Sequence, residues 1–549
     1  MARATFVCIT LITLSQANEF LKSTPKERFE RISEEDVQTS LLEEVEETLG
    51  NGTAANRLRL LEAVLKPMYD ALPKNEHGNL GHSAVRYALH RLFVMRHGWY
   101  IKGLGRHAED ANITSPSGIL KDQVPTYIQS IFEKRLGDKG LGLHDLAVMA
   151  STLEHLVHKE AVSRLGDVYK IFKKFPVNKV DVNTANEMLD IYMMAFILGE
   201  DLSNMTLYEA RSLNDDMPTV FSGWHDTQEF VRRIRLDITQ KAEGKSLSLD
   251  FAALAKVVKA IGEEFGSFQS IECRRLKDTL VNMEFADSGR VRLSDFYKPS
   301  LDGGWQFQES VGYLRQLGAL DESNLDASSV VLVNYLHSQT NCIASSGYYS
   351  VCCKDECEHL IGQLEARIAA PKANPSVIVS LVENMASATV KSSRKLSFTL
   401  TKRLQDIADL NGGDVPLHGR LFAQWMHHAY PRECPYPHKA GTTRQKTADE
   451  WLLETGTDSM ATPEEMQIFT DRVASRSERG DEGIMPWSPE EELLVVCRAD
   501  MPLDASFKFS SLRPALLFLL AGAFAFRLVH SFQTTSKGGH DSSNSKFLV

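Results

Sequence analysis

Apolar residues recur three and four positions apart along most of the region from residue 57 to about residue 285. This spacing places them on one face of a helix, so the pattern predicts amphipathic helices that pack on one another. No alternating run of β-branched residues predicts a sheet, and the sequence therefore indicates a mainly α fold. The stripes behind this prediction are Leu58, Leu60, Leu61, Val64 and Leu65; Leu89, Leu92, Phe93 and Trp99; Leu146, Met149, Leu153, Leu156 and Val157; and Leu189, Tyr192, Met193 and Phe196.

Residues 1–17 contain the three parts of a secretory signal peptide in the correct order. Arg3 supplies positive charge, residues 4–14 are apolar, and Ser15-Gln16-Ala17 is a small-x-small cleavage site. The alternative is a short buried helix. We expect cleavage after residue 17, which leaves residues 18–56 as a charged helical lead-in.

A second apolar run, residues 514–526, lies near the other end between Arg513 and Arg527. As a helix it covers about 20 Å, which is short of a hydrocarbon core of about 30 Å, but flanking arginines can extend their charged groups to the interface. The alternative is a buried core helix. We expect residues 511–530 to form one transmembrane helix and residues 531–549 a cytosolic tail. Together with the signal peptide, this predicts a type I single-pass protein of a secretory-pathway membrane or the cell surface.

Three N-x-S/T sequons support that compartment, and they begin at Asn51, Asn112 and Asn204. All three precede residue 210 and lie beside turn-type residues. We therefore expect these asparagines to carry glycans.

Between the two ends the pattern divides the chain into three parts. Residues 57–298 are helical, residues 299–440 form a helical domain that contains most of the cysteines, and residues 441–510 are a polar stalk. Two sequences in the stalk, Thr462-Pro463-Glu464-Glu465 and Ser488-Pro489-Glu490-Glu491, have a capping hydroxyl followed by proline and glutamate. Each predicts the start of a helix.

Several predicted helices follow a short turn in which two apolar residues lie two positions apart. The turns are Leu141-Gly142-Leu143, Val180-Asp181-Val182, Leu247-Ser248-Leu249 and Val291-Arg292-Leu293. The first two are about forty residues apart, as are the last two. Paired helix–loop–helix units have this spacing.

Over residues 125–300 the chain resembles the EF-hand superfamily, and residues 284–295 match its loop best. Gly289 occupies the sixth loop position, Val291 the eighth and Asp295 the twelfth. The resemblance implies helix–loop–helix geometry and a weak calcium site with side-chain oxygens from Glu284, Ser288 and Asp295. The sequence departs from the family where Glu284 replaces aspartate at position one and Ala286 removes a ligand. Arg290 and Arg292 also add positive charge.

Seven cysteines follow the predicted signal peptide, and an oxidising compartment favours disulfides between them. Cys352 and Cys353 are expected to pair with different partners, because a bond between adjacent cysteines strains the ring that it closes. Cys497, near the predicted membrane helix, is our candidate for the free thiol. Zinc bound by Cys352, Cys353 and Cys357 is the less favoured alternative. The disulfide candidates are Cys273, Cys342, Cys352, Cys353, Cys357 and Cys434.

A second group of possible metal ligands comprises His427, His428, Cys434 and His438, with His418 nearby. The competing interpretation is structural. Leu421, Phe422 and Trp425 mark a buried helix face, and a histidine near the end of that helix favours its dipole. No phosphate-binding loop, nucleophile elbow, zinc-protease or dinucleotide motif is present in the sequence.

The net charge is −11, and no dense block of lysine and arginine occurs, which argues against a nucleic-acid partner. Three hypotheses remain. The first is a non-enzymatic membrane glycoprotein with EF-hand-like helix pairs that acts through contacts with unknown proteins. The second is a calcium-binding protein of the lumen or cell exterior. The third is a lumenal enzyme with a His/Cys metal site near residues 427–438.

Overall fold

The computed structural model describes residues 53–101, 104, 139–175, 177–241, 248–304, 306–324, 327–343, 349–474 and 485–494. The chain divides into two compact units, Met1–Val495 and Val496–Val549, and every described residue lies in the first. The predicted signal peptide, the sequons at Asn51 and Asn112, Cys497 and the predicted span 511–530 lie outside the described residues. Within the residues that are described, no helix is long and apolar enough to cross a membrane.

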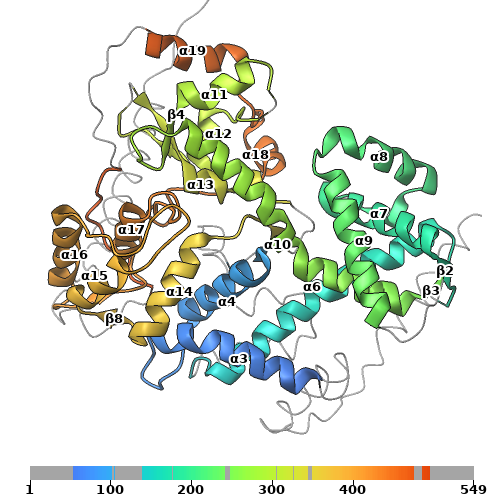
Figure 1. Cartoon of the computed structure of the whole chain (residues 1–549), viewed down its shortest axis with the longest axis horizontal. Helices are drawn as coiled ribbons and strands as arrows, with labels where there is room; N and C mark the ends of the chain where they lie inside the picture. Colours follow the sequence, from blue (N-terminus) through green and yellow to red (C-terminus); the bar gives the residue numbers. More distant parts are fainter. Residues whose placement is uncertain are drawn as a thin grey trace, which may run out of the picture. The chain divides into compact units, whose positions relative to one another are not determined.

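The described residues are mainly helical, as the sequence predicts (Figure 1). The α-helices are α3 (Thr53–Ala71), α4 (His82–His97), α6 (Leu143–Ile171), α7 (Val182–Leu198), α8 (Leu207–Val220), α9 (Trp224–Lys241), α10 (Phe251–Met283), α11 (Leu293–Leu301), α12 (Val311–Gln316), α13 (Leu332–Leu336), α14 (Glu356–Ile368), α15 (Pro375–Glu383), α16 (Phe398–Leu410), α17 (Arg420–Ala429), α18 (Ala448–Thr455) and α19 (Pro463–Ala474). Two short 3-10 helices are η3 (Leu202–Asn204) and η5 (Gln339–Asn341).

The strands are two or three residues long and serve as links between loops. They are β1 (Trp99–Ile101), β2 (Val180–Asp181), β3 (Ser248–Leu249), β4 (Arg290–Arg292), β5 (Leu320–Asp321), β6 (Ser329–Val331), β7 (Tyr349–Val351), β8 (Lys372–Ala373) and β9 (Val415–Pro416). β1 pairs with β7, and β6 lies between β4 and β5. Sequence alternation could not predict such strands, because they are too short to establish a period of two.

In the described part of the chain, four antiparallel contacts each pair two loops that precede helices. Each contact pairs one apolar residue from each loop. The partners are Leu80 with Leu141, Val180 with Leu249, Val291 with Val330, and Ala373 with Val415. The turns predicted from the sequence therefore do precede helices, but Val180 pairs with Leu249 and not with the turn about forty residues before it.

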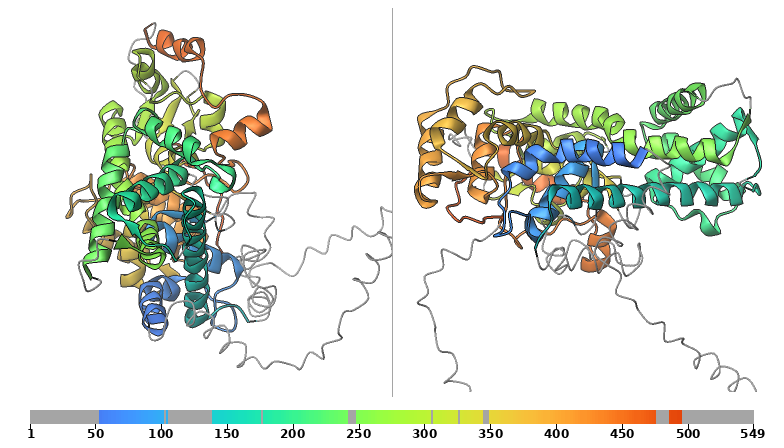
Figure 2. Two further views of the ribbon diagram at one scale, coloured as in Figure 1. Left: turned by 90° about the vertical axis from the view of Figure 1, so that its right-hand side faces the viewer. Right: turned by 90° about the horizontal axis from the view of Figure 1, so that it is seen from below.

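Two long helices each connect two of these loop contacts. α6, with 29 residues, follows the loop of Leu141 and precedes that of Val180. α10, with 33 residues, follows the loop of Leu249 and precedes that of Val291. The two helices pack against each other. They cross in the view of Figure 1, and the right-hand view of Figure 2 shows one above the other.

Three large hydrophobic clusters, and a small one of Cys273, Leu336 and Cys353, form the core of the described residues. The largest involves α3 to α10 together with Tyr349 and Val351, the second involves α14 to α17, and the third runs from the end of α10 to α13. One predicted stripe is partly wrong, because Leu60 and Val64 are 62% and 46% exposed. α3 packs against α6 and α14, which bury Leu58, Leu61 and Leu65 and leave the other flank of the helix uncovered.

The end of the folded body does not coincide with the stalk boundary expected at residue 441. Trp451 of α18 lies 5.6 Å from Tyr313, measured between ring centroids, and α19 packs on α11. Ala461 and Met466 are buried in the third cluster. Residues 448–474 therefore contribute to a core instead of forming a stalk.

One of the two helix starts expected in that segment is confirmed. Thr462 caps α19 by accepting a hydrogen bond from the backbone N–H of Glu465 at 3.2 Å. The other prediction is wrong, because residues 485–493 are not helical. Ser488 and the residues after it instead bind the start of α17, as described below.

Candidate functional site

The loop that best matches the EF-hand pattern joins α10 to α11. Glu284 ends α10, and Ala286, Asp287 and Gly289 all have positive φ angles (53°, 52° and 72°) that turn the chain back toward β4. The Glu284 carboxylate accepts a hydrogen bond from the backbone N–H of Gly289. The residue at position one thus closes the loop from within.

A guanidinium group binds the acidic residues of this loop. Arg432, from the turn after α17, lies with its Nε 2.6 Å from Glu284 Oε2, and its Nη2 also donates to Asp287. The Glu284 side chain is only 2% exposed. Partial burial of Arg432 lowers its pKa, but the hydrogen bonds and charges of Glu284 and Asp287 outweigh this effect and raise it overall. Arg432 therefore supplies a positive charge to the carboxylate that calcium would use.

Close backbone packing holds Arg432 in place. A Cβ atom on Gly289 would lie 2.4 Å from the carbonyl oxygen of Pro431. Any other residue at position 289 would push the Pro431-Arg432 turn away from the loop, in addition to straining the positive φ. The glycine that the EF-hand pattern requires for its turn is also required here for contact with a distant segment.

The three predicted calcium ligands have separate environments. Glu284 binds Arg432, Ser288 donates its hydroxyl to the carbonyl oxygen of Phe285 at 2.7 Å, and Asp295 is exposed in the first turn of α11. Across the described residues, no three or more His, Cys, Asp or Glu side chains form a group that could hold a metal ion.

The arginines expected to oppose a cation bind within the protein. The Arg290 guanidinium is 3% exposed and lies 2.5 Å from Asp321, in the loop whose strand β5 completes the same small sheet. Arg290 and Arg292 both lie 5.0 Å from the centre of the Phe285 ring. Arg290 thus links the paired loops through Asp321, whereas Arg292 contacts its own loop.

A second loop, between α3 and α4, also contains an internal cation. Lys74 Nζ donates to the carbonyl oxygens of Tyr69 and Leu72, the latter at 2.8 Å, and lies 4.4 Å from the Tyr69 ring centre. Asn75 Oδ1 accepts 3.0 Å hydrogen bonds from the N–H groups of His77 and Asn79. This loop, like the first, is organised by protein groups.

The disulfide prediction is confirmed. Cys352 and Cys353 bond to different partners, Cys342 and Cys273, and the third bond joins Cys357 to Cys434. The long-range bonds tie the segment before α14 to α10 and the start of α14 to the turn after α17.

The histidines of the proposed enzyme site bind backbone carbonyls. His427 Nδ1 lies 2.7 Å from the Cys434 oxygen, and His438 Nε2 lies 2.7 Å from the Gly318 oxygen. The Cys434 sulfur is in a disulfide and offers no thiolate to a metal. His428 lies in the last turn of α17, as expected. Burial lowers its pKa to about 3, so the neutral ring adds no positive charge to the helix end at physiological pH.

These buried histidines predict acid destabilisation. Burial lowers the pKa of His427 to about 4, whereas an unfolded histidine titrates near about 6.5, so the unfolded chain binds protons first as the pH falls below that value. We expect the midpoint temperature of unfolding to decrease as the pH is lowered from about 6.5 to about 4. Each such histidine lowers the free energy of unfolding by up to about 1.4 kcal/mol per pH unit. Burial raises the pKa of Asp355 to about 6, which opposes this trend between about pH 6 and 4. Thermal melts across this range should show that His427→Gln flattens the acid limb; an unchanged limb would contradict the assignment.

Two ionic clusters, one buried and one partly buried, were not predicted from the sequence. Arg91 of α4 binds Glu358 and Glu365 of α14, and Glu365 also lies 2.8 Å from His418 Nε2. In the other cluster, Arg57 joins Glu154 to Glu263 at 2.9 and 3.1 Å, with His97 and His158 beside these carboxylates. A charged residue within an apolar stripe, such as Arg91 between Leu89 and Leu92, is the signal that could have revealed them.

No protein-family model, curated protein or solved structure matches this chain. Its function must therefore be inferred from its own residues.

Proposed function

We propose that this chain is a non-enzymatic, single-pass membrane glycoprotein of the secretory pathway or cell surface that acts through protein contacts. Its lumenal region is built from degenerate EF-hand-like helix pairs that hold their shape without calcium. The observation that supports independence from calcium is the ion pair of Arg432 with Glu284, which places a guanidinium on the first calcium ligand of the loop.

Three further observations support it. The apolar loop-to-loop contacts at Val180–Leu249 and Val291–Val330 are the kind that EF-hand pairs use. Three disulfides fit an oxidising compartment. The carbonyl contacts of His427 and His438 give these residues a structural role, which weakens the enzyme alternative.

Calcium titration tests the central claim. We expect calorimetry of the purified protein to show no transition tighter than millimolar, and thermal midpoints to agree in excess calcium and in chelator. Calcium needs six to eight oxygen ligands, and Arg432 already engages the first of them. A micromolar transition that disappears in Asp295→Ala would replace this proposal with the calcium-binding alternative. Stoichiometric zinc in the same preparation would revive the enzyme.

A matched pair of variants tests whether the Arg432 guanidinium provides the positive charge that the Glu284 carboxylate needs in place of calcium. Arg432→Met leaves the buried Glu284 carboxylate without its guanidinium, and we expect it to destabilise the protein by about 1–3 kcal/mol. Arg275→Met removes an ion pair whose arginine is 65% exposed and should cost about 0–1 kcal/mol. Millimolar calcium should raise the midpoint of Arg432→Met alone. Equal losses in both variants would count against a special role for Arg432.

Glycosidase treatment tests the compartment. Asn204, at the end of η3, is exposed, so a glycan can be attached there without unfolding. We expect treatment of the cell-expressed protein to lower its apparent mass, and Asn204→Gln to remove part of the shift. A protein that shows no shift and is recovered in the cytosolic fraction would overturn the proposed topology.

A further inference from the structure

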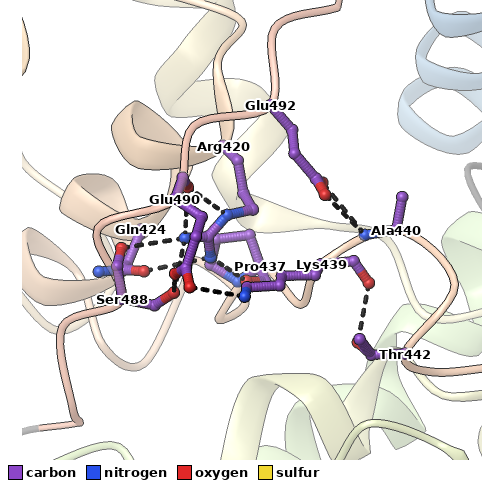
Figure 3. Close-up of polar contacts among 9 residues, drawn as sticks. All are labelled: Arg420, Gln424, Pro437, Lys439, Ala440, Thr442, Ser488, Glu490 and Glu492. Carbon is purple, nitrogen blue, oxygen red and sulfur yellow. Dashed lines mark hydrogen bonds and ion pairs between the residues drawn. The ribbon is translucent and has the colours of Figure 1, made fainter. Parts of the chain in front are cut away.

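Residues 486–492, which are neither helix nor strand, run across the N-terminal end of α17, and Arg420 makes most of the contacts (Figure 3). The Arg420 guanidinium donates to the carbonyl oxygens of Ser488 and Glu490, at 3.0 and 2.7 Å from Nη2, and to the Ser488 hydroxyl. Its backbone N–H donates to the Glu492 carbonyl at 2.9 Å. Arg420 is only 5% exposed, so a buried guanidinium binds the backbone of a non-helical segment.

Acidic side chains complete the contact. Glu491 Oε1 accepts from the backbone N–H of Leu421 at 3.0 Å and thereby caps α17, whose N-cap Gly419 has no side chain to do so. Glu490 lies 2.7 Å from Lys439 Nζ, and the Glu492 carboxylate accepts from the Ala440 N–H at 3.1 Å. Three consecutive glutamates thus meet a helix N-terminus, an ammonium group and a backbone donor.

An aromatic contact fixes the register at the other end. The Trp487 ring lies 5.7 Å from that of His428, and the Arg403 guanidinium lies 4.7 Å from its centre. The Tyr436 hydroxyl donates to the Pro486 carbonyl at 3.1 Å. A buried arginine, a capped helix and an aromatic anchor are the parts of a peptide-recognition site.

We propose that Arg420, the start of α17 and Lys439 form a binding site for an acidic, non-helical segment of a partner protein, which residues 487–492 occupy in cis. The inference rests on the proposed action through protein contacts and names the chemistry of the partner. The sequence Ser488-Pro489-Glu490-Glu491 has a helix-start pattern but is not helical here, so the segment gives up a local preference when it binds. That preference is a reason for the cis segment to be exchangeable.

The test is trans binding of a fluorescent peptide with the sequence of residues 485–494 to the full-length protein. In the wild type the tethered segment competes at an effective concentration of about millimolar. The variant Glu490→Ala/Glu491→Ala/Glu492→Ala keeps the backbone contacts of this segment but loses its three carboxylate contacts, so the peptide should bind this variant about tenfold more tightly than the wild type. In that triple variant, Arg420→Lys should abolish binding, since lysine cannot donate to several carbonyls in a fixed fork. Equal thermal midpoints of the triple variant with and without Arg420→Lys would exclude unfolding as the cause.

Two outcomes would overturn the inference. One is a triple variant that fails to bind the peptide although it remains folded. The other is binding that survives Arg420→Lys or is reproduced by a scrambled peptide of the same composition. Neither outcome bears on the calcium titration, so failure here is distinguishable from failure of the proposed function.

Discussion

Arg91→Met is expected to lower the free energy of unfolding by about 3–5 kcal/mol, because it leaves two buried carboxylates without their positive partner. The Arg91 side chain is 0% exposed and binds Glu358 and Glu365, whose side chains are 18% and 1% exposed. Burial already raises the pKa of Glu358 despite the charge of Arg91. Chemical denaturation of the purified protein measures the loss.

A surface pair and a combined variant provide the controls. The Arg315 side chain is 56% exposed and pairs with Glu322. Arg315→Met should therefore lower the free energy of unfolding by only about 0–1 kcal/mol. Arg91→Met combined with Glu358→Gln and Glu365→Gln should recover part of the lost stability, since no buried charge then lacks a partner. If Arg91→Met alone were as stable as Arg315→Met, the cluster would not hold α4 to α14.

Loss of the Cys357–Cys434 disulfide is expected to destabilise the protein by about 4.5 kcal/mol, since the bond closes a long loop in the unfolded chain. The sequence separation is 77 residues, and both cysteines lie in the second hydrophobic cluster. The Cys342–Cys352 bond spans only 10 residues, and its loss should cost about 2.7 kcal/mol. Melting of the two double Cys→Ser variants compares them directly. A larger loss for the short loop would show that packing, and not chain entropy, sets the order.

The helices were predictable because their apolar stripes are regular, and the stripe of Leu189, Tyr192, Met193 and Phe196 is buried as expected. The turns at Val180 and Val291 were predictable because two apolar residues lie two positions apart before each helix. Their partners were not, since nothing local in a loop states which distant loop its two-residue strand will meet. The disulfide connectivity was hidden for a similar reason, because six cysteines allow many pairings.

The candidate site was predictable in part. The loop pattern located Glu284 and Gly289, and its departures from the family pointed to weak calcium binding. Arg432 could not be found, because it reaches the loop only through the fold of α17 and the turn after it. The helix predicted to start at Ser488 does not form, although its local capping signal is present. The Ser488 hydroxyl and the Glu491 carboxylate, which would cap that helix, instead accept hydrogen bonds from Arg420 and Leu421.

The position of α6 and α10 between successive loop contacts limits how such a chain can diverge. Because α10 ends one hairpin and begins the next, a genetic deletion or exchange bounded by one pair would remove half of its neighbour. New material enters such an architecture most easily in segments that belong to no pair, such as the α7–α9 connection containing α8. We therefore expect the α6 to α11 region to be inherited as a block, with changes in length concentrated in its connections.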